Sequence, residues 1–172
     1  QLRPELTNDE EKIQSAIQEI SYDHIPQQYM VQPSSTRAVA LNLKTGVERV
    51  AYINGAGDNV AESIEAVGVN VEKFDSEDIT LEKLNSFDAV ILGIRAFNVH
   101  ESLSYKKNVL WTYAHQGGNL LIQYNTSRGL KTRTITPYSI ELSRDRITDE
   151  NSKVKMLDIK HPLLNYPNKI SL

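Results

Sequence analysis

The pattern of apolar and polar positions changes its period repeatedly from residue 50 onwards. Val50 to Ile53 is an apolar run that leads into Gly55, and residues 60 to 67 then carry apolar side chains at helical spacing. Gly68 suits the left-handed end of that helix, and Val69 to Phe74 is typical of a second strand. Strand, glycine loop, helix and strand together predict a right-handed βαβ crossover.

The same alternation continues through the middle of the chain. Ala89 to Gly93 is continuously apolar, as expected for a strand that helices cover on both faces. A helix is predicted from Leu103 to the glycines at 117 and 118, and Leu120 to Ile122 makes a fourth strand. Four strands alternating with helices predict an α/β fold with a flavodoxin-like, mostly parallel and doubly wound sheet, in which the first and third strands are neighbours.

The remaining segments have weaker patterns. The sequence predicts a short helix over 8–20, an extended connector over 22–35, a strand over 37–43, a loop with a helical turn over 75–86, and two strands over 138–142 and 154–157. We therefore expect residues 1–35 to be the tail of a preceding domain with its linker, and residues 36–172 to form the α/β domain.

Composition narrows the range of functions. The chain has 172 residues, of which 40% are hydrophobic, and its 19 basic and 22 acidic side chains give a net charge of -3. This weak acidic balance offers no attraction for phosphate backbones, so we expect no nucleic acid partner. The chain has no cysteine, which excludes disulfides, thiolate metal ligands and a cysteine nucleophile. No apolar run approaches the roughly 20 residues of a membrane span.

The glycine loop after the first predicted strand is the first candidate site. Gly55-Ala56-Gly57-Asp58-Asn59-Val60 resembles a dinucleotide fingerprint, but Val60 stands where the third glycine is needed for close packing of helix and strand. Asp58 would also repel a pyrophosphate. The favoured interpretation is a tight turn in which Asp58 or Asn59 caps the following helix.

A second candidate follows the third predicted strand. Arg95 stands at its carboxyl end, where a guanidinium group can bind a carboxylate or reach Asp58 on the neighbouring loop. Asp58 and Arg95 would then flank the crevice between the first and third strands. The structural alternative, which we favour, is an internal ion pair that fastens the two loops together.

Two further runs have weaker signals. Thr126 and Ser127 follow the fourth strand, where some hydrolases carry a nucleophile, and His100 is the histidine closest in topology, but no Gly-x-Ser-x-Gly pattern is present. The run Arg144-Asp145-Arg146, followed by acidic residues at 149 and 150, suggests a self-neutralising surface network or a contact with another segment. No histidines or carboxylates have a recognised metal-ligand spacing, so we expect no metal site.

Several of these motifs also carry a family resemblance. From about residue 19 to the end, the chain resembles the C-terminal region of large bacterial PIG-L (LmbE-like) family deacetylases. The motifs that carry it are Tyr52–Asp58, Asp88–Asn98, Gly117–Thr126, Leu142–Glu150 and His161–Ile170. That region is in turn similar to the class I glutamine amidotransferase-like fold, including ThuA-like proteins, whose Asp-x-x-His-Pro-Leu/Ile segment resembles Asp158–Leu163 here.

The departures from those families shape the expected function. PIG-L deacetylases use a zinc site in an N-terminal domain with an Ala-His-Pro-Asp-Asp-Glu type motif, which this chain lacks. The resemblance therefore implies a parent protein that is a zinc-dependent N-deacetylase, with zinc only in a domain outside this chain. Amidotransferases need a cysteine after the fourth strand, and this chain has none. The resemblance also implies a further strand and helix, hence a domain truncated at its C-terminus, and a periplasmic or secreted location.

We accordingly expect a non-catalytic accessory domain of a PIG-L family protein, which packs against other domains of the same polypeptide or recognises a polar ligand such as a sugar. The candidate ligand-binding residues share the predicted carboxyl edge of the sheet: Asp58, Asn59, Arg95, Asn98, Tyr124 and Asn125. No catalytic residue and no cofactor are expected within the segment. Two alternatives remain open: a hydrolase that uses Thr126 or Ser127 with His100, or Asp58 as a base, and a purely structural domain whose crevice a neighbouring domain fills.

Overall fold

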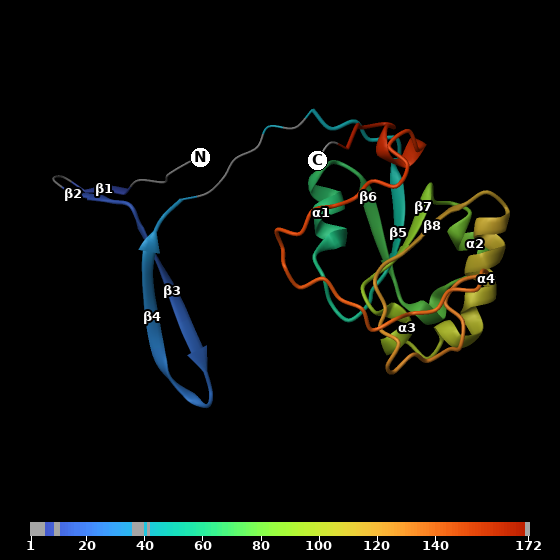
Figure 1. Ribbon diagram of the computed structural model, residues 1–172, viewed down its shortest axis with the longest axis horizontal. Helices are drawn as coiled ribbons and strands as arrows, with labels where there is room; N and C mark the ends of the chain where they lie inside the picture. Colours follow the sequence, from blue (N-terminus) through green and yellow to red (C-terminus); the bar gives the residue numbers. More distant parts are fainter. Residues whose placement is uncertain (1–5, 9–10, 36–39, 41, 171–172) are drawn as a thin grey trace. The chain divides into compact units, whose positions relative to one another are not determined.

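A computed structural model describes residues 6–8, 11–35, 40 and 42–170 of the chain. The chain divides into two units, Gln1–Asn42 and Leu43–Leu172, which are described separately (Figure 1). The α/β domain therefore begins a few residues later than the expected boundary at residue 36.

The first unit consists of β-hairpins. Strand β1 (Leu6–Asn8) pairs with β2 (Glu11–Ile13), and strand β3 (Ser15–Tyr22) pairs with β4 (Ile25–Pro33), both antiparallel. The helix predicted over 8–20 is therefore wrong. An isolated helix of that length is marginal without a core to cover its apolar face, whereas pairing with β4 satisfies the backbone of an isoleucine-containing segment. The connector predicted over 22–35 is extended, and most of it is strand β4.

The second unit is built on a four-stranded parallel sheet. Its strands are β5 (Arg49–Ile53), β6 (Asn70–Phe74), β7 (Ala89–Leu92) and β8 (Asn119–Ile122), in the order β6-β5-β7-β8 (Figure 1). All four predicted strands and their parallel direction are confirmed. The first and third strands of the unit are neighbours, which is consistent with a flavodoxin-like arrangement.

Helices cover both faces of this sheet. The helical segments are α1 (Val60–Ala66), α2 (Leu81–Leu84), α3 (Ala96–Val99) and α4 (Leu103–His115), with short 3-10 turns η1 (Ser76–Asp78) and η2 (Pro162–Leu164). Helix α1 lies on one face, and α2, α3 and α4 lie on the other (Figure 1). Gly68, just beyond α1, has a φ of 91°, which confirms the predicted left-handed helix end.

The core follows the alternation of side chains along the strands. Successive residues of β5 and β7 point to opposite faces. Ala51, Ile53, Val90 and Leu92 pack in one cluster with the α4 residue Leu110. Val50, Tyr52 and Ile91 pack in the other cluster with Ala61 of α1 and Val71 of β6. Both faces of the central strands are therefore buried, as their continuously apolar sequence predicted.

The long segment after β8 has no strand within its described residues, up to residue 170. The strands predicted over 138–142 and 154–157 are therefore wrong. Tyr138, Val154 and Leu157 are 79%, 62% and 89% exposed, so their apolar pattern is not matched by a neighbouring strand or core. Of the strand predicted over 37–43, residues 37–39 and 41 lie outside the described residues, and Asn42 and Leu43 belong to no strand.

The segment near residue 168 is tied back to the start of the domain. The side chain of Asn168 accepts a hydrogen bond from the Lys44 backbone nitrogen at 2.9 Å and donates one to the Lys44 carbonyl at 2.7 Å. Residues 163, 166 and 167 line a small, mostly apolar pocket of about 500 Å³ together with residues 44–47. The segment that contains η2 therefore lies at the amino edge of the sheet.

Candidate functional site

Three loops meet at the carboxyl edge of the sheet. They follow β5 (residues 54–59), β7 (residues 93–95) and β8 (residues 123–128), and parallel strands bring them to one edge. The Ala56 nitrogen donates to the Ile94 carbonyl at 2.7 Å, and the Arg95 nitrogen donates to the Tyr124 carbonyl at 2.6 Å. The middle loop is therefore hydrogen-bonded to both of its neighbours.

The predicted crevice between β5 and β7 is filled by the chain's own backbone. A Cβ atom on Gly55 would lie 2.0 Å from the Ile94 carbonyl oxygen, and one on Gly93 would lie 2.7 Å from the Gly55 nitrogen. Real side chains do not tolerate such distances, so both positions need glycine for this contact. The expectation that Asp58 and Arg95 flank an open crevice there is therefore wrong, because the two loops touch directly.

Asp58 fastens this junction. One of its carboxylate oxygens accepts hydrogen bonds from the Tyr52 hydroxyl at 2.5 Å and from the Val60 nitrogen at 3.0 Å, and the other accepts one from the Ile94 nitrogen at 3.0 Å. Burial alone would raise the pKa of Asp58, but these three donors outweigh it and lower the pKa below its ordinary value. Asp58 thus caps the start of α1, as predicted, while the side chain of Asn59 makes no capping bond and is exposed.

Tyr52 is a partner of this carboxylate that the sequence analysis missed. The residue is 2% exposed, and its hydroxyl accepts a hydrogen bond from the Gln123 side chain at 2.9 Å while it donates to Asp58. Burial first, and the neighbouring Asp58 carboxylate second, raise the pKa of Tyr52 far above its ordinary value. A tyrosine in an otherwise apolar buried strand was the available signal, because a buried hydroxyl needs a polar partner.

Asn98 and Asn125 lock the second and third loops together. The Asn98 amide nitrogen donates to the carbonyls of Thr126 and Arg128 at 3.0 and 3.2 Å, and its oxygen accepts from the Thr126 nitrogen at 3.0 Å. The Asn125 oxygen accepts from the Phe97 nitrogen at 3.1 Å. Both side chains are buried, at 7% and 5% exposure, so their amides hold the loops in place and are not presented to a ligand.

Arg95 occupies an unusual backbone position. Its φ of 59° and ψ of 24° are left-handed, a conformation that costs a residue other than glycine about 1–3 kcal/mol. The next two residues, Ala96 and Phe97, are fully buried, while Arg95 itself is exposed. Among the described residues Arg95 forms no ion pair, so the predicted internal pair with Asp58 is not formed. Neutral donors satisfy Asp58 instead.

An open groove lies beside Arg95 rather than in the predicted crevice. It has a volume of about 1230 Å³ and lies between the loop after β8 and the later segment 143–148. Its lining residues are Arg95, Tyr124, Asn125, Thr126, Ser127, Arg128, Ser143, Arg144, Asp145, Arg146, Ile147 and Thr148. Three of the six predicted ligand-binding residues, Arg95, Tyr124 and Asn125, therefore line one groove. The other three, Asp58, Asn59 and Asn98, do not line it.

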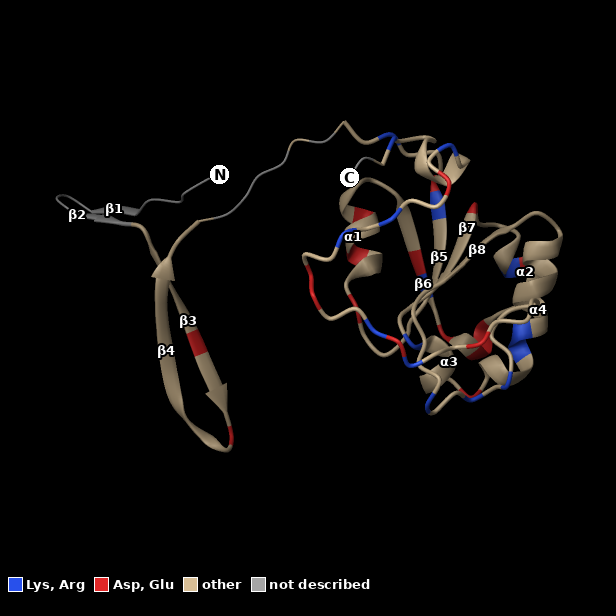
Figure 2. Cartoon of the chain, in the orientation of Figure 1, with Lys and Arg blue, Asp and Glu red and all other residues tan. Residues whose placement is uncertain are grey.

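The charged run at 144–146 forms one wall of this groove. Figure 2 shows basic and acidic positions following one another along the segment that passes α3. Asp145 accepts a hydrogen bond from the Ser143 hydroxyl at 3.0 Å, but no ion pair forms within the run in the described part of the chain. The prediction of a self-neutralising network of ion pairs is therefore wrong, whereas the alternative of a contact with another segment stays a prediction.

No nucleophile and base are paired at this edge among residues 42–170. The Thr126 hydroxyl donates to the Arg128 carbonyl at 2.9 Å, and the His100 ring is 2.6 Å from the Asn54 carbonyl oxygen. Ser127 lines the groove without a hydrogen bond to a histidine. Within the described residues, no cluster of three or more histidine, aspartate or glutamate side chains could hold a metal ion. No described helix combines the length and apolar character needed to cross a membrane.

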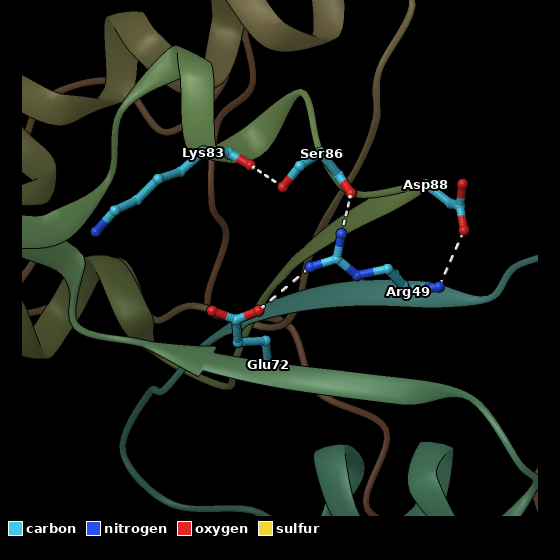
Figure 3. A network of polar contacts seen from close by, with 5 residues as sticks. All are labelled: Arg49, Glu72, Lys83, Ser86 and Asp88. Atoms are coloured by element: carbon cyan, nitrogen blue, oxygen red, sulfur yellow. Dashed lines mark hydrogen bonds and ion pairs between the residues drawn. The ribbon is translucent and has the colours of Figure 1, made fainter.

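A separate polar network connects the strands near the amino edge of the sheet (Figure 3). The Asp88 carboxylate accepts hydrogen bonds from the backbone nitrogens of Glu48 and Arg49 at 2.8 and 2.9 Å. The Arg49 guanidinium donates to the Ser86 carbonyl at 3.1 Å and pairs with Glu72 at 3.5 Å. The backbone bonds from Arg49 and Glu48 lower the pKa of Asp88. These contacts join β5, β6 and the start of β7, which is a structural role.

Comparisons with known proteins leave the family open. No protein-family model matches the chain, and no curated protein sequence matches it.

Proposed function

We propose that residues 43–172 form a non-catalytic accessory domain that binds a hydroxyl-rich ligand, such as a sugar, in the groove beside Arg95. The observation that carries this proposal is the groove itself, whose lining combines arginine, serine and threonine residues with the aromatic residue Tyr124. The Tyr124 side chain is 58% exposed there. Sugars bind to such surfaces because an aromatic ring covers their apolar face while polar groups replace water at each hydroxyl.

The proposal extends to the parent protein. The motifs around Gly55, Arg95 and Tyr124 resemble the C-terminal region of PIG-L family deacetylases, and the order of the four parallel strands is compatible with a class I amidotransferase-like fold. In that setting the zinc-dependent deacetylation of a sugar would occur in another domain, and this domain would hold the substrate or pack against the catalytic domain. The absence of cysteine supports a role without amidotransferase chemistry.

The contacts of the loops favour binding over hydrolysis. Thr126 and His100 each hydrogen-bond to a backbone carbonyl of the domain, and Asp58 is held by three donors. A hydrolase would need its nucleophile within hydrogen-bond reach of a base, and no described hydrogen bond joins Thr126 or Ser127 to His100.

A saccharide titration of the 172-residue chain tests the proposal. We expect neutral and acidic sugars of a test panel to perturb backbone NMR signals of residues 124–128 and 143–148, because those residues line the groove. Tyr124→Ala should weaken the binding, whereas Tyr138→Ala, which removes a 79% exposed ring outside the groove, should not. If no sugar in the panel perturbs these signals, the proposed function is wrong.

A further inference from the structure

Four arginine residues and one acidic residue line the groove. The arginines are Arg95, Arg128, Arg144 and Arg146, and the acidic residue is Asp145. In the described part of the chain, every ion pair involves other residues: Arg49 with Glu72, Lys73 with Glu62, and Lys131 with Glu101. No described hydrogen bond uses any of the four guanidinium groups either. The groove is therefore a basic patch on a protein whose net charge is -3.

Such a patch differs from an ordinary scatter of surface arginines. Like charges that share a concavity raise the local positive potential, because the protein walls restrict screening by water. Each guanidinium group also offers a planar fork of donors that matches the oxygens of a carboxylate or a phosphate. The one carboxylate in the lining, Asp145, accepts a hydrogen bond from the Ser143 hydroxyl at 3.0 Å and offsets only one of the four positive charges.

Hydrogen bonds to backbone groups fix the two loops that carry Arg95 and Arg128. The Arg95 nitrogen is bonded to the Tyr124 carbonyl, and the Arg128 carbonyl accepts from both the Asn98 amide and the Thr126 hydroxyl. Arg95 has a left-handed backbone and is exposed, while the next two residues are buried. A binding wall that is ordered before the ligand arrives loses less conformational entropy on binding.

We propose that the groove selects sugars that carry an anionic group, a carboxylate or a phosphate, over neutral sugars. This inference rests on the proposed function and specifies its ligand class. Arg144 and Arg146 contact the anionic group from one wall, Arg95 and Arg128 contact it from the other, and Tyr124 packs against the sugar ring.

Three matched monosaccharides show whether the groove prefers a neutral sugar, a sugar with a carboxylate or a sugar with a phosphate. Galactose, galacturonic acid and galactose 6-phosphate share a ring configuration and differ at one carbon. Each is titrated into the 172-residue chain while the NMR signals of the groove are followed, and inorganic phosphate alone serves as the sugar-free anion. We expect the two acidic sugars to bind more tightly than galactose, and we expect added salt to weaken their binding.

The double variant Arg144→Gln/Arg146→Gln tests the residues themselves. Both side chains are exposed and have no described ion pair or hydrogen bond, so their replacement leaves the fold intact. The affinity for the acidic sugars should fall at least about tenfold, and it should fall by a larger factor than the affinity for galactose. Arg133→Gln, which removes an exposed arginine outside the groove, is the matched control and should leave both affinities unchanged.

The outcomes distinguish the two proposals. Equal affinity for galactose and the acidic sugars, or an unchanged preference in the double variant, overturns the anion inference and leaves the sugar-binding function standing. Binding of phosphate alone, with no contribution from any sugar ring, contradicts the sugar-binding function. No binding of any of these compounds overturns both.

Discussion

Gly55 and Gly93 meet backbone to backbone at the carboxyl edge of the sheet. A Cβ atom on Gly93 would lie 2.7 Å from the Gly55 nitrogen and 2.9 Å from the Tyr52 hydroxyl oxygen. This contact closes the position between β5 and β7 where open α/β sheets commonly bind ligands. The groove of this domain lies instead beside Arg95, on the loop after β7, and Tyr124, on the loop after β8.

Gly93→Ala should destabilise the domain. The added methyl group collides with backbone and with a buried hydroxyl, neither of which can move freely, so we expect a loss of about 1–3 kcal/mol in the free energy of unfolding. Urea denaturation followed by circular dichroism measures this loss. Gly46→Ala is the control, because a Cβ there would meet no atom within 4 Å. Equal stability of the two variants would show that the loops are not in contact.

Tyr52→Phe should weaken the junction and shift the titration of Asp58. The variant removes one donor to the carboxylate and leaves the Gln123 amide without its hydroxyl partner, at a cost of about 1–2 kcal/mol in the free energy of unfolding. The pKa of Asp58 should rise, because the Tyr52 hydroxyl is one of the donors that lower it. Carbon-detected NMR of the Asp58 carboxyl group measures the pKa. Tyr138→Phe, at a 79% exposed ring, should change neither quantity.

Asn98→Ala should loosen the loop after β8. The substitution leaves the Thr126 nitrogen and carbonyl without their Asn98 partner and removes one of the two donors to the Arg128 carbonyl, so we expect a loss of about 1–3 kcal/mol in the free energy of unfolding. Amide hydrogen exchange should accelerate most at residues 126–128. The exposed Asn151 provides a matched Asn→Ala control that should leave exchange in this loop unchanged. Wild-type exchange rates in Asn98→Ala would contradict the structural role of this amide.

Asp88 should make the amino edge of the sheet sensitive to acid. Its pKa in the folded protein is lower than the ordinary value of 3.8, mainly because the backbone nitrogens of Arg49 and Glu48 donate to it. The stability that this ionisation contributes is fully present above the unfolded pKa and is lost as the pH falls through the lower folded pKa. Asp88→Ala should therefore reduce the dependence of stability on pH between about 5 and 2. Glu150→Ala, at an exposed position, should preserve that dependence; identical curves for the two variants would refute this role of Asp88.

The central elements could be predicted because their patterns are local. Val50 to Ile53 and Ala89 to Leu92 are continuous apolar runs, and both are buried strands. The pattern over 8–20 was ambiguous, because isoleucines at helical spacing are also good strand residues once a pairing partner such as β4 is present. Sequence alone does not say whether that partner exists.

The predicted site residues do lie at the carboxyl edge of the sheet, but several of them have structural roles there. Arg95 and Tyr124 line the groove. The side chains of Asn98 and Asn125, in contrast, form hydrogen bonds with backbone groups almost 30 residues away in sequence. Which partner an amide takes depends on loop geometry that no local pattern encodes. The wall formed by residues 143–148 has no regular secondary structure, so its approach to Arg95 left no periodic signal.

The glycine contact also provides a way to recognise proteins that differ from this one. A chain with the same strand order but an alanine or serine in place of Gly93 would have to move the two loops apart. The residue at this one position therefore decides whether the loops after β5 and β7 can touch.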